Sequence, residues 1–271
     1  MLIAEDDIQD INQILLAETG TFISPDKKNL IELRLSSRIK ELGFIDLQDY
    51  LAYLKMNNQE RLIFFNLLTT NYTNFCRESY HFEILIKELI PQILKTKDEI
   101  SIWSAGCSSG EEAYTIAILL NHFFANKLNF NILGTDINTE VLRAAKTGIY
   151  TQEEINRLKP EYLFNNFQQG VGKYEGYYRV KAQLRENIKF EHLNLNKFAR
   201  EGIKKKFDII FCRNVLIYFN ESNRKRVIAQ FNQSLTKPGF LILGHSENIN
   251  LAKAENNSIW EKIARNSYQK I

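Results

Sequence analysis

The amino-acid sequence predicts an α/β protein: a Rossmann-like sheet follows an all-helical N-terminal domain and carries a small antiparallel β insertion. Three observations carry this prediction. Apolar residues recur at helical spacing from about residue 8 to 70, with no clear strand among them. A short apolar run, a turn of small residues and a helical pattern then follow in order. Finally, β-forming residues alternate between glycine turns from about residue 170 to 193.

The composition excludes several classes of protein. The 271 residues suffice for one large domain or two smaller ones, and 44% hydrophobic and 25% charged residues are ordinary for a globular chain. A formal net charge of +3 is too small to predict nucleic-acid binding. No apolar run is long enough to span a bilayer, and acids stand where a signal peptide needs basic and apolar residues. We therefore expect no nucleic-acid partner and no membrane insertion.

The cysteines and histidines are scattered along the chain. The three cysteines form no C-x-x-C pair, so neither a zinc site nor a disulfide framework is indicated. The four histidines do not cluster either, so we expect no metal. A reducing, cytoplasmic setting is the simplest one for such a chain.

The first 72 residues are predicted to form the helical domain, and residues 73–271 the α/β domain. The apolar faces of the first three helices are Ile8, Ile11, Ile14 and Leu15, then Leu30, Leu33, Leu35, Ile39 and Leu42, then Leu47, Tyr50, Leu51 and Leu54; a fourth runs from Leu62 to Leu68. Arg34 and Arg38 lie one turn apart on the second helix. They form either a solvated surface or a basic face that binds an acidic protein partner.

A polar segment with aromatic residues, residues 71–82, joins the two domains. Domain junctions are common ligand sites, so Asn71, Thr73 and Arg77 are candidates to reach a ligand in the next domain. Alternatively, Thr73 or Asn74 caps a helix that runs from residue 78 to 90.

The turn after the apolar run 100–103 is the centre of the predicted site. Its glycines let the backbone approach a ligand, and the following helix points unpaired N–H groups at it. No Lys follows the turn, so it is not a P-loop, and the absence of G-x-G-x-x-G disfavours a dehydrogenase. Glu111 and Glu112 would repel a pyrophosphate, which favours a ligand with hydroxyls or a cationic end. The alternative is a tight strand-to-helix turn without a ligand.

Asp136 follows the second apolar run, residues 130–134, where an acid accepts hydrogen bonds from ribose hydroxyls. It could instead cap the helix 139–146, which Gly148 ends, although Asn138 or Thr139 could serve as that cap. Thr151 and Glu154 then form a capping-box signature.

The β insertion interrupts the alternation of strands and helices. An exposed strand edge there could receive a peptide by strand addition, or the hairpin only lengthens a crossover. Residues 207–212 are then apolar apart from Asp208, which predicts a central parallel strand. A helix over 221–235, a strand over 240–243 and a strand pair over 259–268 complete the pattern.

Five motifs in this order resemble those of the CheR family, the S-adenosylmethionine-dependent methyltransferases that esterify glutamates on bacterial chemoreceptors. They are Asn71-x-Thr73-x-x-x-Arg77, the run from Trp103 to Glu112, Gly134-Thr-Asp-Ile, the run from Phe211 to Phe219, and Gly244-His-Ser-Glu-Asn248. The resemblance implies a class I methyltransferase sheet with the helical domain and the β insertion already described.

The resemblance also implies site residues. The cofactor, S-adenosylmethionine, and its product, S-adenosylhomocysteine, would be bound by Asn71, Thr73, Arg77, Ala105, Gly106, Glu112, Asp136, Asn194, Leu195, Cys212 and Arg213. Asp136 would hold the ribose, Asn194 and Leu195 would contact the adenine side, and Glu112 would favour the cationic end.

The implied reaction needs no general base, because a glutamate with a reference pKa of about 4.3 is already ionised near neutral pH. Arg77 could orient the substrate carboxylate with two hydrogen bonds and Tyr218 with one. The alternatives are a structural salt bridge and a core tyrosine.

The implied partner is a chemoreceptor cytoplasmic helix, and the face with Arg34 and Arg38 suits its acidic surface. The turn Gly170-x-Gly172-x-x-x-Gly176 resembles the loop of family members that dock a receptor's C-terminal tail on the insertion. Two other functions stay open: a methyltransferase of this fold with another substrate, and a non-catalytic module that binds the cofactor and signals through partners.

Overall fold

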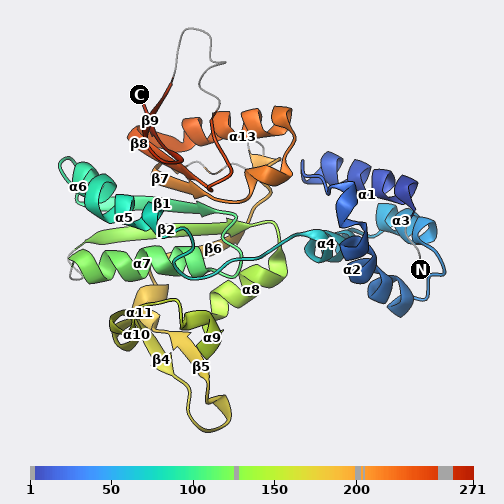
Figure 1. Cartoon of the computed structure of the whole chain (residues 1–271), viewed down its shortest axis with the longest axis horizontal. Helices are drawn as coiled ribbons and strands as arrows, with labels where there is room; N and C mark the ends of the chain where they lie inside the picture. The colour runs from blue at the N-terminus through green and yellow to red at the C-terminus, as the bar shows by residue number, and fades with distance from the viewer. Residues whose placement is uncertain (1–3, 125–127, 199–202, 204, 250–258) are drawn as a thin grey trace.

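The computed structural model describes residues 4–124, 128–198, 203, 205–249 and 259–271. It confirms the predicted fold class: a helical N-terminal domain, a mixed and mostly parallel seven-stranded sheet, and a separate three-stranded antiparallel sheet. Figure 1 shows the N-terminal helices to one side of the large sheet, with the small sheet projecting below it.

The N-terminal domain consists of α1 (Glu5–Glu18), α2 (Lys28–Glu41), α3 (Leu47–Met56) and α4 (Asn58–Leu68), with a 3-10 turn over Pro25–Lys27. Asp46 and Asn57 begin α3 and α4 as N-caps, because each side chain accepts a hydrogen bond from a backbone N–H of the first turn. The predicted apolar faces meet in one core. Leu30 and Leu33 of the second predicted face do not join this core, because Ile31, Leu35 and Ile39 fill the inward face of α2; Leu33 is 76% exposed.

The large sheet has the strand order β6-β2-β1-β7-β8-β10-β9. Its parallel strands are β1 (Glu99–Ala105), β2 (Asn129–Asp136), β6 (Ile188–His192), β7 (Phe207–Cys212) and β8 (Leu235–Leu243). The predicted C-terminal pair is confirmed as β9 (Trp260–Ala264) and β10 (Ser267–Lys270), which pair antiparallel. The strand predicted to be central, β7, lies between β1 and β8 and is buried throughout.

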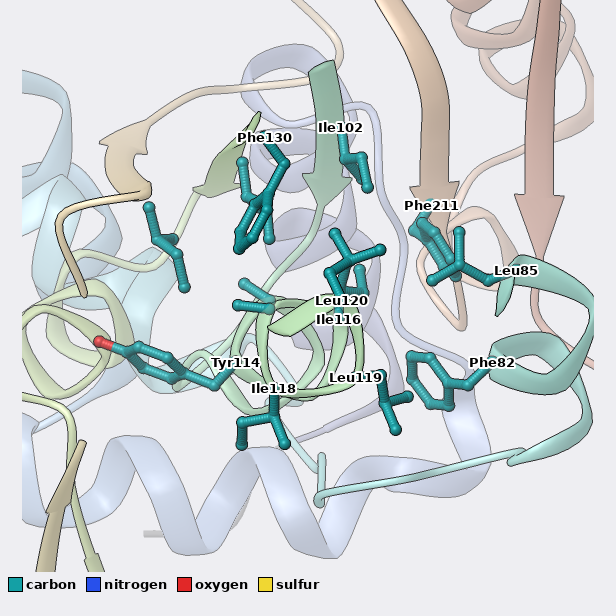
Figure 2. Packing of buried hydrophobic residues seen from close by; sticks show 14 of the residues in the cluster. Phe82, Leu85, Ile102, Tyr114, Ile116, Ile118, Leu119, Leu120, Phe130 and Phe211 are labelled. Carbon is teal, nitrogen blue, oxygen red and sulfur yellow. The ribbon is translucent and has the colours of Figure 1, made fainter. Parts of the chain in front are cut away.

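Strands β1, β7 and β8 divide their side chains between two hydrophobic cores, as the period of two requires. In β1, Ile100 and Ile102 join the core under α7 (Glu111–Phe124), whereas Trp103 and Ala105 join the core under α13 (Glu221–Ser234). Figure 2 shows the first core, where Ile116 and Leu120 of α7 lie against the sheet and Phe82 lies near Phe211. The two faces of the sheet are therefore each covered by a packed core.

The remaining helices belong to the α/β part of the chain. The helix predicted over residues 78–90 is formed by α5 (Tyr80–Ile84), a π-helical turn (Leu85–Leu89) and α6 (Ile90–Ile93). Helix α8 (Thr139–Thr147) ends at Gly148, which has a positive φ, and the predicted capping box opens α9 (Gln152–Ile155). Short helices α10 (Pro160–Asn166) and α11 (Ala182–Arg185) and 3-10 turns over Gly172–Tyr174 and Leu216–Tyr218 complete the described part of the fold.

The β insertion has different boundaries from those predicted. Its sheet has the order β3-β5-β4 and is built from β3 (Ile149–Thr151), β4 (Phe167–Gln169) and β5 (Tyr177–Val180). The prediction that residues 187–192 belong to this insertion was wrong, because β6 pairs parallel with β2 and forms an edge of the large sheet. The sequence of β6 alternates buried and exposed residues, a pattern that an edge strand shares with a hairpin strand.

Membrane-spanning helices and metal-ligand clusters are both absent from the described residues. None of the helices there is long and apolar enough to cross a membrane. Within the same ranges, no group of three or more His, Cys, Asp or Glu side chains could hold a metal ion.

Candidate active site

A cavity lies between the N-terminal domain and the carboxyl ends of β1, β2 and β7, where open α/β sheets bind ligands. It has an empty volume of about 1390 Å³, which includes the open solvent at its mouth. The predicted site residues on its wall are Arg34, Asn71, Thr73, Arg77, Gly106, Glu112, Asp136, Asn194, Leu195, Arg213 and Tyr218.

Three predicted site residues are absent from the wall. Ala105 and Cys212 end β1 and β7 with their side chains in the core under α13. Burial raises the pKa of the Cys212 thiol well above its usual value, so the thiol stays protonated. Neither side chain faces the cavity. The third is Arg38, which is described below.

The turn after β1 brings the backbone close to the neighbouring loop. Gly106 has a φ of 83°, and a Cβ placed on it would lie 2.3 Å from Cγ2 of Val215. The N–H groups of Gly106 and Cys107 both donate to the carbonyl oxygen of Thr135, at 2.7 and 2.9 Å. This position therefore requires glycine, and the turn is locked to the end of β2.

Asp136 lies beneath this turn and is buried. One carboxylate oxygen accepts from the backbone N–H of Ser108 and the other from that of Asn138, each at 2.9 Å. Asn138 is the N-cap of α8, so Asp136 does not serve as that cap. Burial raises the pKa of Asp136, although the backbone donors of Asn138 and Ser108 oppose the rise. Each oxygen keeps further lone-pair capacity for a hydroxyl donor.

Glu112 and Arg213 form an ion pair at the base of the cavity. Nη1 of Arg213 lies 3.1 Å from Oε2 of Glu112, and Oγ of Ser104 donates to Oε1 of Glu112 at 2.6 Å. Burial raises the pKa of Glu112, and the nearby guanidinium opposes this. The carboxylate thus already has a cationic partner inside the protein. Arg213 therefore offsets part of the negative charge of Glu112 and weakens its predicted attraction for the cationic end of a ligand.

Arg213 is also held from the other side. Its Nη2 lies 3.4 Å from Oε2 of Glu78 and donates to the backbone carbonyl of Arg77. Burial alone would raise the pKa of Glu78, but the hydrogen bond from His245 and the charge of Arg213 outweigh it and lower the pKa. Glu78 is therefore ionised and fixes the guanidinium of Arg213.

Arg77 and Tyr218 both lie on the wall and are partly exposed. Nη1 of Arg77 donates to the carbonyl oxygen of Tyr72 at 2.8 Å, and no ion pair of Arg77 exists among the described residues. The ring of Tyr218 faces Nζ of Lys27 at 5.6 Å. Neither the structural salt bridge nor the fully buried core tyrosine, the two alternatives, is present in this geometry.

Asn71 and Asn194 line the cavity and form hydrogen bonds to distant segments of the chain. The carbonyl oxygen of Asn71 accepts from Oγ of Ser108 at 2.8 Å. Nδ2 of Asn194 donates to the carbonyl oxygen of Glu18, the last residue of α1, at 2.7 Å. Both residues therefore tie parts of the cavity together that are far apart in the sequence.

The two arginines of α2 differ in their surroundings. Nη1 of Arg34 donates to the carbonyl oxygens of Leu68 and Thr69, at 3.3 and 2.9 Å, on the cavity wall. Arg38 instead forms a two-pronged pair with the buried Glu60, at 2.9 and 2.5 Å, and also bonds Glu41. The prediction that both arginines present a free basic face therefore needs correction at Arg38, whose guanidinium is engaged within the domain.

Sequence reasoning missed the contribution of the N-terminal domain to the wall. Phe22, Lys27 and Leu30 line the cavity, as does Ser108 of the turn. The N–H of Phe22 donates to the carbonyl oxygen of Tyr218 at 2.9 Å, which joins two segments almost two hundred residues apart. Local periodicity carries no signal for such a contact.

Comparisons with known proteins agree with this layout. Residues 71–264 match the family described as CheR methyltransferase, SAM binding domain, and residues 6–69 match the family described as CheR methyltransferase, all-alpha domain. The chain is 39% identical over 259 residues to the chemotaxis protein methyltransferase of Borreliella burgdorferi, a match that covers 91% of this chain and 89% of that protein. It is 36% identical over 242 residues to that of Escherichia coli, covering 88% and 82%. A probable chemotaxis protein methyltransferase of Rhizobium etli is 31% identical over 263 residues, covering 94% and 96%.

Proposed function

The chain belongs to the CheR family of S-adenosylmethionine-dependent chemotaxis protein methyltransferases, and we propose that its methyl acceptors are glutamate side chains of chemoreceptors. The observation that carries the proposal is the cavity between the two domains, with the carboxylate of Asp136 at its base and Arg77 and Tyr218 on its wall. This arrangement suits a nucleoside on one side and an anionic acceptor on the other.

The residues present fit the cofactor. Asp136 keeps lone pairs for two ribose hydroxyls, and Gly106 leaves a space without a side chain beside it. Leu193 and Leu195 add an apolar wall. We propose that Asn71, Thr73, Glu112, Asn194 and Arg213 complete the binding residues, while Ala105 and Cys212 contribute through their backbone.

S-adenosylmethionine, when bound, supplies a methyl group on a positively charged sulfur. The task of this chain is then to align the acceptor carboxylate, because a glutamate is already ionised near neutral pH. Arg77 has one nitrogen bonded to the carbonyl of Tyr72, which leaves guanidinium donors for a carboxylate. The hydroxyl of Tyr218 offers a further donor on the same wall. No residue is required to remove a proton.

The receptor surface is the finer part of the proposal. We propose that Arg34, rather than Arg38, meets the acidic receptor helix, since Arg38 is paired with Glu60. At the insertion, β3 and β4 are the edges of the three-stranded sheet, and Gly172 and Gly176 have positive φ in the loop before β5. Those edges support strand addition by a receptor tail, and calorimetry with a tail peptide that shows no binding would remove this part.

The proposal also covers the domain boundaries and the cellular location of the protein. We propose an N-terminal domain of residues 1–72 and a methyltransferase domain of residues 73–271, which act together in the cytoplasm on the cytoplasmic helices of the receptor. Contacts across the division support joint action: Nδ2 of Asn138 donates to the carbonyl oxygen of Asn66 at 3.1 Å.

The test is a methyl-transfer assay with methyl-labelled S-adenosylmethionine and a chemoreceptor cytoplasmic fragment. Label should enter the fragment as base-labile ester on glutamate, and a fragment with those glutamates replaced by alanine should stay unlabelled. Label that is stable to base, or that enters a small molecule but no receptor, would contradict the proposed acceptor.

Two variants assign the acceptor-binding roles. Arg77→Lys keeps the charge but loses the two-pronged grip, and Tyr218→Phe loses only the hydroxyl. Each should lower kcat by roughly tenfold to a hundredfold, since each removes a donor that aligns the carboxylate. Arg143→Lys, on the exposed surface of α8, serves as the control. Unchanged turnover in both variants would remove these roles.

A further inference from the structure

Glu247 is a buried carboxylate directly behind the cavity, within the motif Gly244-His-Ser-Glu-Asn248 that follows β8. Its residue is 3% exposed, and it forms no ion pair among the residues that the structure describes. An isolated buried carboxylate is costly unless hydrogen bonds satisfy it. Glu247 therefore calls for a specific set of donors.

Four backbone N–H groups supply them. Oε2 of Glu247 accepts from Gly244 at 2.6 Å and from Asn214 at 2.8 Å. Oε1 accepts from Val215 at 3.0 Å and from Ile217 at 3.2 Å. Since a carboxylate has about four lone-pair sites, this set uses its full capacity. Three of the four donors belong to one segment, residues 214–217.

That segment forms part of the cavity wall. Arg213 precedes it and Tyr218 follows it, and both line the cavity together with Asn214 and Val215. Asn214 has a φ of 59°, a conformation that costs energy in a residue with a side chain unless the surroundings hold it. Glu247 holds the backbone here through the N–H of Asn214 itself, while Nδ2 of the Asn214 side chain donates to Oε1 of Glu78 at 3.4 Å.

The neighbouring glycines show how closely these parts fit. A Cβ on Gly244 would lie 2.7 Å from the backbone nitrogen of Asn214 and 2.7 Å from Oε2 of Glu247. On the other side, Val215 fills the space where a Cβ of Gly106 would lie. Displacement of residues 214–217 would therefore shift both the turn at Gly106 and the side chain of Tyr218.

We propose that Glu247 is a positioning residue for the methyl-transfer reaction: its carboxylate fixes residues 213–218 so that Arg213 and Tyr218 keep their places on the wall. This rests on the proposed function of the cavity. The N–H groups of Asn214, Val215 and Ile217 donate to this carboxylate instead of to a carbonyl oxygen of a helix or strand. The carboxylate itself does not line the cavity.

The test compares Glu247→Gln with wild type by two measurements. Gln has the same shape, but its amide NH2 group is a donor. It would replace the oxygen that accepts from two of the four N–H groups and leave those two without an acceptor. Hydrogen exchange of the peptide that covers residues 213–218 should become faster on the order of tenfold. In the folded variant, kcat for a receptor fragment should fall on the order of a hundredfold. Glu83→Gln on the exposed surface of α5 is the matched control and should change neither.

A role in stability alone would give a different result. The melting temperature would fall, but exchange in residues 213–218 and kcat of the folded protein would match wild type, and that result would overturn the proposal. If Glu247→Gln does not fold, Glu247→Asp, which keeps the charge, takes its place; loss of folding in both variants would also overturn it. If the wild-type protein transfers no methyl group to the receptor fragment, the proposed function is refuted. The hydrogen exchange of residues 213–218 would still decide whether Glu247 holds that segment.

Discussion

At the scale of the residue, we propose that cofactor binding depends most on Asp136. Its two oxygens hold Ser108 and Asn138 and keep lone pairs for a ligand. Asp136→Asn replaces one acceptor by a donor. The affinity for S-adenosylhomocysteine, measured by calorimetry, should fall by roughly 10- to 100-fold, as expected for hydrogen bonds to a charged group. Asp98→Asn, at an exposed position, should bind as wild type does; equal affinities in the two variants would exclude Asp136 from the site.

Glu111 predicts a pH dependence of stability. Burial raises its pKa to about 7 in the folded chain, although Ser109 donates to the carboxylate. The unfolded chain has the ordinary value of 4.5, so the stabilising effect of the protonated form is fully present below about 4.5 and is lost as the pH rises through about 7.

Glu111→Gln should therefore gain stability over wild type between pH 5 and 8, by up to about 3 kcal/mol, in urea unfolding. Glu153→Gln, an exposed acid on α9, provides the comparison. Parallel stability curves for wild type and Glu111→Gln would show that the pKa of Glu111 is not raised.

Sequence patterns located individual residues only where a local motif fixed their place. Asp136 follows a recognisable strand, so its position at the sheet's edge could be predicted. The pairing of Arg38 with Glu60 could not, because the two are 22 residues apart and charge spacing on one helix says nothing about a second helix. Likewise, Glu112 could be placed at the helix start, but its partner Arg213 lies 101 residues away.

At the scale of the element, the turn between β1 and α7 needs glycine for two reasons. Gly106→Ala places a Cβ against Val215 at a φ of 83°. Gly43→Ala has almost the same φ, 78°, but nothing lies within 4 Å of its Cβ. Both variants should lose about 1–2 kcal/mol of stability from the left-handed backbone. Only Gly106→Ala should also lose cofactor binding by calorimetry; equal binding in the two would show that the turn adapts.

The pairing between α2 and α4 gives a second prediction at this scale. Arg38→Met leaves Glu60 buried without its cation and should cost on the order of 2 kcal/mol in urea unfolding. This is less than for a fully buried pair, because the Arg38 side chain is 21% exposed. Arg143→Met breaks an exposed pair and should cost little. A folded, stable Arg38→Met that no longer binds receptor would instead restore Arg38 as a receptor contact.

Elements were predictable to the extent that their period was distinctive. The helices of the N-terminal domain and the strand β7 were found from apolar spacing, since burial on one face or on both leaves a clear pattern. β6 was assigned to the wrong sheet, because a short alternating strand does not encode its partner. Its pairing with β2 depends on contacts between residues more than fifty positions apart.

At the scale of the whole molecule, the site exists only where the two domains meet. Thr21 and Phe219 form an isolated antiparallel bridge, and Lys197 pairs with Glu18 at 2.6 Å across the same boundary. The sequence indicated two domains and a ligand at their junction. It did not indicate that Phe22 and Lys27 would form part of the wall. Contacts between domains do not change the spacing of apolar residues in either domain, so they cannot be recognised from that spacing.

The most direct test of the account is a crystal structure of the protein with S-adenosylhomocysteine. We predict that the ribose hydroxyls lie within hydrogen-bond distance of the Asp136 carboxylate and that the sulfur faces the part of the cavity with Arg77 and Tyr218. A nucleoside bound elsewhere, or a sulfur directed away from both residues, would contradict it.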